Sequence, residues 1–146
     1  LMTLGHGVTN RMLQERFQHS GETISRHFHK VLDACVRMSI DIVKPQQPHA
    51  PFPQEKRSNP KFWPYFNKCI GAIDGTHIKA TAPAHMQVPY IGGKGVPTQN
   101  VMAACGWDMY FIFVLAGWEG SAHDTRIFYN VIRSPTLNFS HPNRGW

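Results

Sequence analysis

Two aspartates in the sequence stand where a carboxylate can do chemistry. Asp74 follows the apolar run 69–73, and Asp124 stands at the start of an expected helix. A carboxylate at the end of an apolar strand is costly unless it is solvated, paired or bound to a metal ion. Hard cations such as Mg²⁺ bind carboxylate oxygens and recruit substrate phosphates, and two such ions about 4 Å apart can cleave a phosphodiester. Asp74 and Asp124 are therefore the candidate catalytic and metal-binding residues.

Each aspartate also has a structural interpretation, and the sequence leaves both open. Asp74 and Gly75 form an Asp-Gly pair of the kind that makes turns between strands. A glycine at this position also lets another group come close to the backbone. The run 121–124, Ser-Ala-His-Asp, matches a capping box in which Asp124 reaches back to the cap residue Ser121. On this interpretation Asp124 is primarily structural.

The elements that must position these residues follow from hydrophobic periodicity. Three strands are expected, at 69–80, 100–107 and 110–116. Asp108 and Met109 leave room for a tight hairpin between the second and third strands. A helix is expected over 122–132, with Pro135 just beyond its end. This order of strand, hairpin and helix predicts an α/β or α+β sheet domain.

A helical region is predicted over residues 1–43. Two helices joined by the Gly-containing turn 18–21 fit a helix-turn-helix, with Ser20 as the cap of the second helix. An apolar stripe with helical spacing marks the second helix, formed by Ile24, Phe28, Val31, Cys35 and Met38. The opposite face carries Arg26, Lys30 and Arg37, which suit contacts to DNA phosphates and base edges. The alternatives are a solvated face of an ordinary helical hairpin and a module that binds another protein.

Residues 44–68 are predicted to be a Pro-rich linker followed by an aromatic entry segment. Five prolines lie within the 17 residues 44–60, a density that disfavours regular structure.

The net charge of +6 is uneven along the chain. Residues 1–68 hold 10 Lys/Arg against 5 Asp/Glu, or +5, and residues 69–146 hold 5 against 4, or +1. A basic first half favours a polyanionic partner, and Lys94, between two glycines, is a further candidate phosphate contact.

The three cysteines, Cys35, Cys69 and Cys105, are far apart and form no C-x-x-C pair. This spacing disfavours a zinc site and predicts reduced thiols that serve as small core residues. The apolar runs are shorter than the roughly 18 residues that a membrane span needs, and no secretory signal is visible, so no membrane association is expected.

Several blocks, in the same order, resemble the PIF/Harbinger-type transposases and the nuclease-like proteins derived from them. These blocks are GAIDGTHI at 71–78, the run 90–95, TQNVMAAC at 98–105 and VLAGWEGSAHDTR at 114–126. Upstream, residues 14–26 are similar to the helical region that precedes the nuclease domain in plant members. Together the blocks cover nearly the whole chain, and their order is more specific than any one of them.

The resemblance implies a ribonuclease-H-like fold, a DDE carboxylate triad, Mg²⁺ or Mn²⁺ as cofactor, DNA as partner and a location in the nucleus. Asp74 matches the first triad carboxylate, and Asp124 matches an acid that is characteristic of the family. The second triad acid should follow a fourth strand, so it and a Glu-bearing helix are expected beyond Trp146. Gly93 departs from the family pattern, which usually has Arg at this position.

The expected organisation is therefore a helical DNA-binding-like region at 1–43, the linker and entry segment at 44–68, and a partial nuclease domain at 69–146. The expected function is that of a metal-dependent DNA endonuclease derived from a transposase, incomplete and inactive as this fragment. A non-catalytic, transposon-derived DNA-binding protein is the alternative, because the chain lacks later carboxylates.

Overall fold

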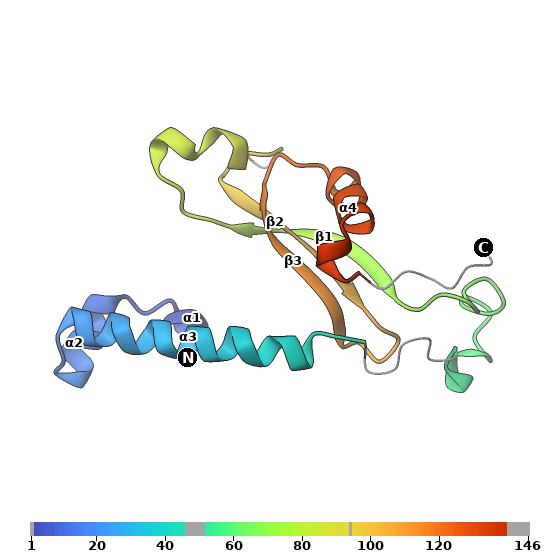
Figure 1. The fold of residues 1–146 in the computed structure, drawn as a ribbon, viewed down its shortest axis with the longest axis horizontal. Coiled ribbons are helices and arrows are strands. Elements are labelled where there is room, and N and C mark those ends of the chain that lie inside the picture. The colour runs from blue at the N-terminus through green and yellow to red at the C-terminus, as the bar shows by residue number, and fades with distance from the viewer. Residues whose placement is uncertain (1, 46–51, 94, 140–146) are drawn as a thin grey trace. The chain divides into compact units, whose positions relative to one another are not determined.

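The computed structural model describes residues 2–45, 52–93 and 95–139. They divide into two compact units, 1–42 and 43–146. The first unit contains the helices α1 (Met2–His6), α2 (Asn10–Phe17) and α3 (Gly21–Ile42) (Figure 1). The predicted pair of helices with a short turn is confirmed as α2 and α3. The one-turn helix α1 was not predicted.

Local hydrogen bonds set the ends of α2 and α3. The Thr9 hydroxyl oxygen accepts a 3.4 Å hydrogen bond from the amide of Met12 and caps α2. Gln18 then adopts a left-handed conformation, with φ of 53°, and ends that helix. The Ser20 hydroxyl oxygen accepts a 3.2 Å hydrogen bond from the amide of Thr23, so the predicted cap at Ser20 is confirmed.

The apolar stripe of α3 is largely uncovered. Ile24 and Phe28 are half-buried, whereas Val31 and Met38 are exposed. Cys35 is also exposed, and Cys69 and Cys105 are half-buried. The expectation that the cysteines serve as small core residues is therefore wrong for Cys35.

The second unit contains a three-stranded antiparallel sheet in the order β1-β2-β3. Its strands are β1 (Ala72–Lys79), β2 (Thr98–Cys105) and β3 (Phe111–Glu119). The helix α4 (Asp124–Arg133) follows β3. The predicted strand, hairpin and helix are confirmed, with boundaries that differ by a few residues, and the fold class is α+β with a partial sheet domain.

One face of the sheet is packed against α4. Alternate residues of β2 are buried, namely Thr98, Asn100, Met102 and Ala104. Ile127 and Val131, one helical turn apart on α4, are fully buried and form a core with Met102. The side chains of a strand alternate between its two faces, so this core fixes which residues of the sheet point toward α4.

The connection between β2 and β3 is a hairpin, as expected, but its loop comprises residues 106–110 rather than Asp108 and Met109 alone. The Gly106 amide donates a 3.0 Å hydrogen bond to the Tyr110 carbonyl oxygen. Met109 adopts a left-handed conformation with φ of 66°. Further along β3, the register with β2 shifts, and Gly117 there has φ of 100°, a conformation that favours glycine.

The aromatic entry segment packs onto the sheet unit. Phe52 is buried and its ring contacts those of Trp63 and Trp107. The Trp107 indole nitrogen donates a 2.7 Å hydrogen bond to the Cys69 carbonyl oxygen. Residues 43–68 thus group with the sheet, and the part of the predicted linker at 46–51 lies outside the described residues.

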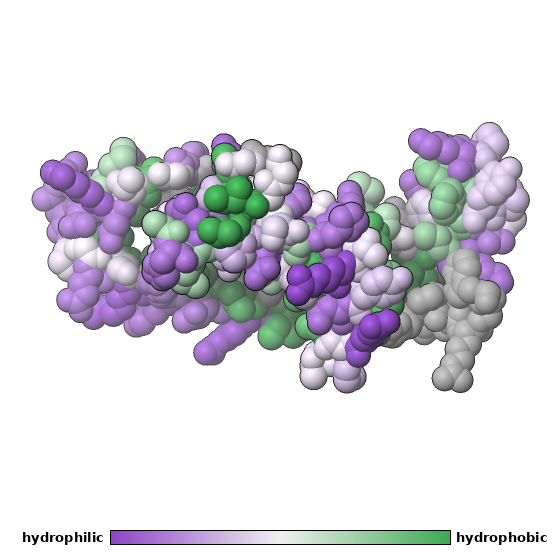
Figure 2. Space-filling model, turned by 90° about the horizontal axis from the view of Figure 1, so that it is seen from above, coloured by the Kyte–Doolittle hydropathy of each residue, from purple (hydrophilic) through white to green (hydrophobic). Residues whose placement is uncertain are grey.

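Hydrophilic residues predominate on the face in Figure 2, where hydrophobic residues gather in separate patches. Among the described residues, no helix combines the length and apolar content that crossing a membrane requires.

Candidate functional site

Asp74 is the third residue of β1, and its side chain is exposed. Its Oδ1 atom accepts a 2.9 Å hydrogen bond from the amide of Gly75. The strand runs on to Lys79, so Asp74 lies within the strand rather than at its end, and the Asp-Gly pair is not a turn. The prediction that the strand continues through Asp74 is confirmed.

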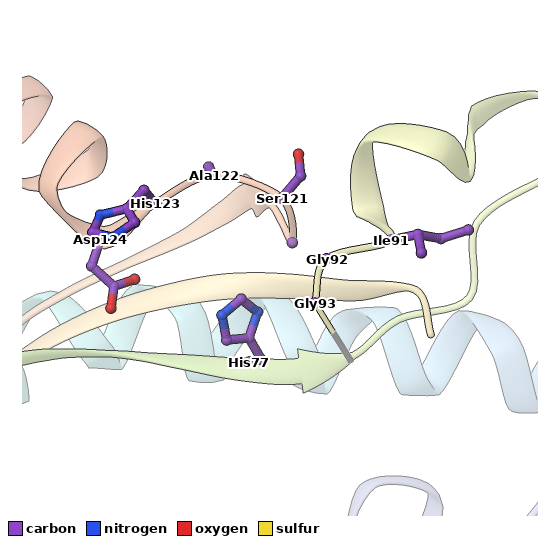
Figure 3. Close-up of a pocket in the computed structure, with 9 residues that line it drawn as sticks. His77, Ile91, Gly92, Gly93, Ser121, Ala122, His123 and Asp124 are labelled. Atoms are coloured by element: carbon purple, nitrogen blue, oxygen red, sulfur yellow. The ribbon is translucent and has the colours of Figure 1, made fainter. Parts of the chain in front are cut away.

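Asp124 is the first residue of α4, and its half-buried carboxylate points toward the sheet (Figure 3). The Asn100 side-chain nitrogen donates a 2.6 Å hydrogen bond to Asp124 Oδ1. A Cβ atom placed on Gly75 would clash with the Asp124 carboxylate. Gly75 therefore lets another group come close to its backbone, as expected, and that group is the carboxylate of Asp124.

The capping box predicted for Ser121 and Asp124 is wrong. The N-cap residue of α4 is His123, whose Nδ1 atom accepts a 3.2 Å hydrogen bond from the amide of Thr125. Ser121 instead donates its backbone amide to the Pro89 carbonyl oxygen, at 3.1 Å. The carboxylate of Asp124 is turned toward Asn100 and Gly75, and His123 caps the helix.

The two candidate metal ligands lie on opposite faces of the sheet. Gly75 pairs with Met102, whose side chain is part of the core beneath α4. Asp74 pairs with Ala103 and so projects from the other face. Within the described part of the chain, no three His, Cys, Asp or Glu side chains are grouped so that they could hold a metal ion. The Asp74 and Asp124 carboxylates therefore both lie beside Gly75, one on each face of the sheet.

A pocket of about 460 Å³ opens beside Asp124, between β1 and the start of α4. Its lining includes His77, Ile91, Gly92, Gly93, Ser121 and Asp124 (Figure 3). The Nδ1 atom of His77 lies 3.2 Å from the Thr98 hydroxyl oxygen, so one ring nitrogen is engaged within the sheet. The pocket is therefore lined by a carboxylate and by the imidazoles of His77 and His123, and Asp74 is not among its lining residues.

Asn100 is the residue of this site that the sequence analysis missed. It is fully buried in β2 and donates hydrogen bonds to the Ala122 carbonyl oxygen, at 3.1 Å, and to Asp124. Among the described residues, its Oδ1 atom has no hydrogen-bond partner. The available signal was a polar side chain at an inward-facing position of an apolar strand, because such a group is costly to bury without partners.

The predicted DNA contacts Arg26, Lys30 and Arg37 are all exposed on α3. Their spacings of four and seven residues place them on one side of the helix, opposite its apolar stripe. Asp33 lies between Lys30 and Arg37 in sequence, and α3 as a whole holds three Lys/Arg and three Asp/Glu. Lys94, the fourth predicted contact, lies outside the described residues.

Comparison with known proteins gives a different family match for each of the two units. Residues 73–141 match the family model described as DDE superfamily endonuclease. Residues 1–37 match a domain of unknown function, DUF8040. A curated relative, "Protein ALP1-like" from Arabidopsis thaliana, is 27% identical over 135 residues, which are 89% of this chain and 32% of the relative. No solved structure gives a significant match.

The predicted resemblance to a plant-like DDE endonuclease is therefore confirmed for part of the chain. The matched segment begins within β1, includes Asp74 and Asp124, and extends past α4. The chain spans about a third of the length of the curated relative.

Proposed function

We propose that residues 69–146 are the first part of a metal-dependent DNA endonuclease domain of ribonuclease-H-like type, derived from a PIF/Harbinger transposase and acting in the nucleus. The match of 73–141 to the DDE superfamily endonucleases carries this proposal. The position of Asp74 supports it, because an exposed carboxylate held on a strand is accessible to a hydrated cation and to a phosphodiester.

The cofactor of this activity is Mg²⁺ or Mn²⁺, and the described residues do not by themselves form its site. Asp74 supplies one carboxylate, and Asp124 lies over the other face of the sheet. No group of three ligating side chains occurs in the described part of the chain. A divalent cation bound in this way polarises the phosphodiester and activates water when further carboxylates complete its coordination. We therefore expect weak metal binding and no cleavage by this chain alone.

A plasmid-nicking assay tests the proposal. This chain and a longer polypeptide that contains it are each compared with their Asp74→Asn forms, in Mg²⁺ and in Mn²⁺. We expect nicking by the longer polypeptide, loss of nicking with Asp74→Asn and no nicking by this chain. Asp108→Asn is the matched control, since Asp108 is an exposed aspartate of the hairpin whose acceptor role toward the Tyr110 amide an asparagine can retain. Nicking that survives Asp74→Asn would refute the assignment of Asp74.

A non-catalytic, transposon-derived DNA-binding protein is the second candidate. One observation favours it: among the described residues, no three ligating side chains are grouped for a metal ion, and a two-metal centre needs several carboxylates. In this case DNA binding resides in the helical unit, through Arg26, Lys30 and Arg37, with Lys94 as a further contact. DNA binding without metal-dependent nicking by the longer polypeptide would select this candidate.

A further inference from the structure

The segment 52–68, which leads into the start of β1, concentrates the positive charge of the chain (Figure 1). It holds four Lys/Arg against one Asp/Glu, or +3, out of a total of +6. The helix α3, by contrast, holds three Lys/Arg and three Asp/Glu. A dense group of cations favours a polyanion such as a nucleic acid. The segment also belongs to the same unit as Asp74.

Three of these cations are held over aromatic rings. The Lys56 ammonium lies 5.6 Å from the centroid of the Phe62 ring. The Arg57 guanidinium lies 5.3 Å from the centroid of the Trp63 ring, and the Lys61 ammonium lies 5.9 Å from that of Phe62. Within the described part of the chain, none of the three forms an ion pair. The rings therefore gather the cations without neutralising their charge.

Two further rings of the segment are not needed for its packing. Tyr65 is 78% exposed and Phe66 is 47% exposed. Neither ring contacts another ring among the residues that the structure describes. Phe52, by contrast, is buried against Trp63 and Trp107 and anchors the segment. Exposed rings beside unpaired cations are typical of a surface that binds a ligand.

Consecutive turns fix the positions of the exposed rings. The Phe66 amide donates a 2.9 Å hydrogen bond to the Phe62 carbonyl oxygen, and the Cys69 amide donates a 3.0 Å hydrogen bond to the Phe66 carbonyl oxygen. Phe62 is the ring beneath two of the cations, so Tyr65 and Phe66 follow the cations by one turn. The bond from Trp107 to the Cys69 carbonyl oxygen secures the end of the segment. Rings that are already positioned lose little conformational entropy when they bind a ligand.

We propose that the segment 52–68 binds a single strand of nucleic acid. Its cations contact the phosphates, and the rings of Tyr65 and Phe66 stack on unpaired bases. Single-strand sites combine these two features, because phosphates attract cations and every base has a face on which an aromatic ring can stack. A duplex hides those faces within its own stack of bases, so the exposed rings favour the single strand.

The place of the segment in the chain gives this site a use. Asp74 follows Lys68 by six residues, which span at most roughly 20 Å of extended chain. Nucleotides beside a phosphodiester at Asp74 are therefore within reach of the segment, and bases that are unpaired there find rings to stack on. This inference rests on the proposed function in taking DNA as the nucleic acid.

Fluorescence anisotropy with labelled oligonucleotides tests the stacking. The probes are an oligothymidine of about 12 nucleotides and its duplex with oligoadenosine, both in EDTA. Tyr65→Ala should weaken binding of the single strand about tenfold, the effect of losing one stacked base, and should leave binding of the duplex unchanged. Tyr65→Phe, which keeps the ring, should bind the single strand like the unsubstituted chain.

A second variant tests the phosphate contacts. Arg57→Ala with Lys61→Ala should lower the slope of log K against log salt by about 1.4 for the single strand, at about 0.7 for each contact. Tyr129→Ala and Arg133→Ala are the matched controls, because on α4 the Arg133 guanidinium lies 5.3 Å from the centroid of the ring of Tyr129, which is 51% exposed. Each control variant should bind the single strand nearly as the unsubstituted chain does.

Three results would overturn the proposal. They are unchanged single-strand binding by Tyr65→Ala, equal losses for single strand and duplex, and competition by polyglutamate as effective as that by oligothymidine. The last would make the segment a surface for acidic proteins. The assay needs neither metal nor cleavage, so its failure leaves the nicking test of the proposed function standing. A failure of nicking by the longer polypeptide likewise leaves the single-strand result standing.

Discussion

Asn100 donates a 2.6 Å hydrogen bond to the carboxylate of Asp124, and this bond ties the central strand of the described sheet to the first residue of α4. The same nitrogen also reaches the carbonyl oxygen of Ala122. A buried side chain thereby sets the position of a helix start, and the start of that helix in turn closes one side of the pocket.

The hydrogen bonds of Asn100 predict a large loss of stability when they are removed. Asn100→Ala should lower the free energy of unfolding by about 2 kcal/mol, since hydrogen bonds to charged groups contribute roughly 1.5–3 kcal/mol. Gln99→Ala is the matched control, because Gln99 is an adjacent amide residue that points to the opposite face of β2. Urea unfolding followed by circular dichroism measures both. Equal losses for the two variants would contradict this account of Asn100.

The packing of α4 predicts which of its apolar residues are essential. Ile127 is fully buried against the sheet, whereas Tyr129 is 51% exposed on the outer side of the helix. Ile127→Ala should therefore lower the free energy of unfolding by about 2–5 kcal/mol, through lost burial and the cavity left behind. Tyr129→Ala should cost less than about 1 kcal/mol. A similar unfolding midpoint for both variants would show that α4 does not pack as described.

The cap of α4 gives a test of the corrected helix start. His123→Ala should destabilise the protein by about 0.5–1 kcal/mol, because the Thr125 amide loses its acceptor, and His123→Asn should largely preserve stability. Ser121→Ala should have little effect, since the described contact of Ser121 uses its backbone amide. Thermal unfolding of the three variants checks this order. A greater loss with Ser121→Ala than with His123→Ala would restore the capping box predicted from the sequence.

Local patterns predicted the elements well, and contacts between distant residues account for what was missed. The strands, the hairpin, α3 and α4 follow from periodicities of 2 and 3.6 within single segments. The orientation of Asp124 depends on Asn100, 24 residues earlier, and on the close approach to Gly75. No local sequence pattern reveals these contacts of Asp124, so the sequence predicted a helix-capping role for this residue. The short α1 was missed because five residues are too few to show a periodicity.

The faces of the sheet on which Asp74 and Asp124 lie also could not be predicted from local sequence patterns. The alternation along β1 predicts that Asp74 and His77 project to opposite sides, but not which side α4 covers. The register of β1 with β2 and the burial of Met102 decide that question. Sequence reasoning therefore identified Asp74 and Asp124 as candidates, and the pairing of the strands placed their side chains on opposite faces of the sheet.

The helical unit gives the last prediction, that α3 binds DNA through phosphate contacts. Arg26 and Lys30 are exposed one turn apart, and each lost phosphate contact should reduce the slope of log K against log salt by about 0.9. Arg26→Ala with Lys30→Ala should therefore lower the slope by about two units in fluorescence titrations with duplex DNA. The control is Arg11→Ala with Arg16→Ala, which removes the same charge from α2 and should change the slope less.

The acidic residues of α3, such as Asp33, reduce the general attraction of this helix for a polyanion, so specific contacts rather than net charge must account for its affinity. Equal changes in slope for the two double variants would show that DNA binding depends on net charge alone. An unchanged slope with Arg26→Ala and Lys30→Ala would favour a helical unit that binds another protein.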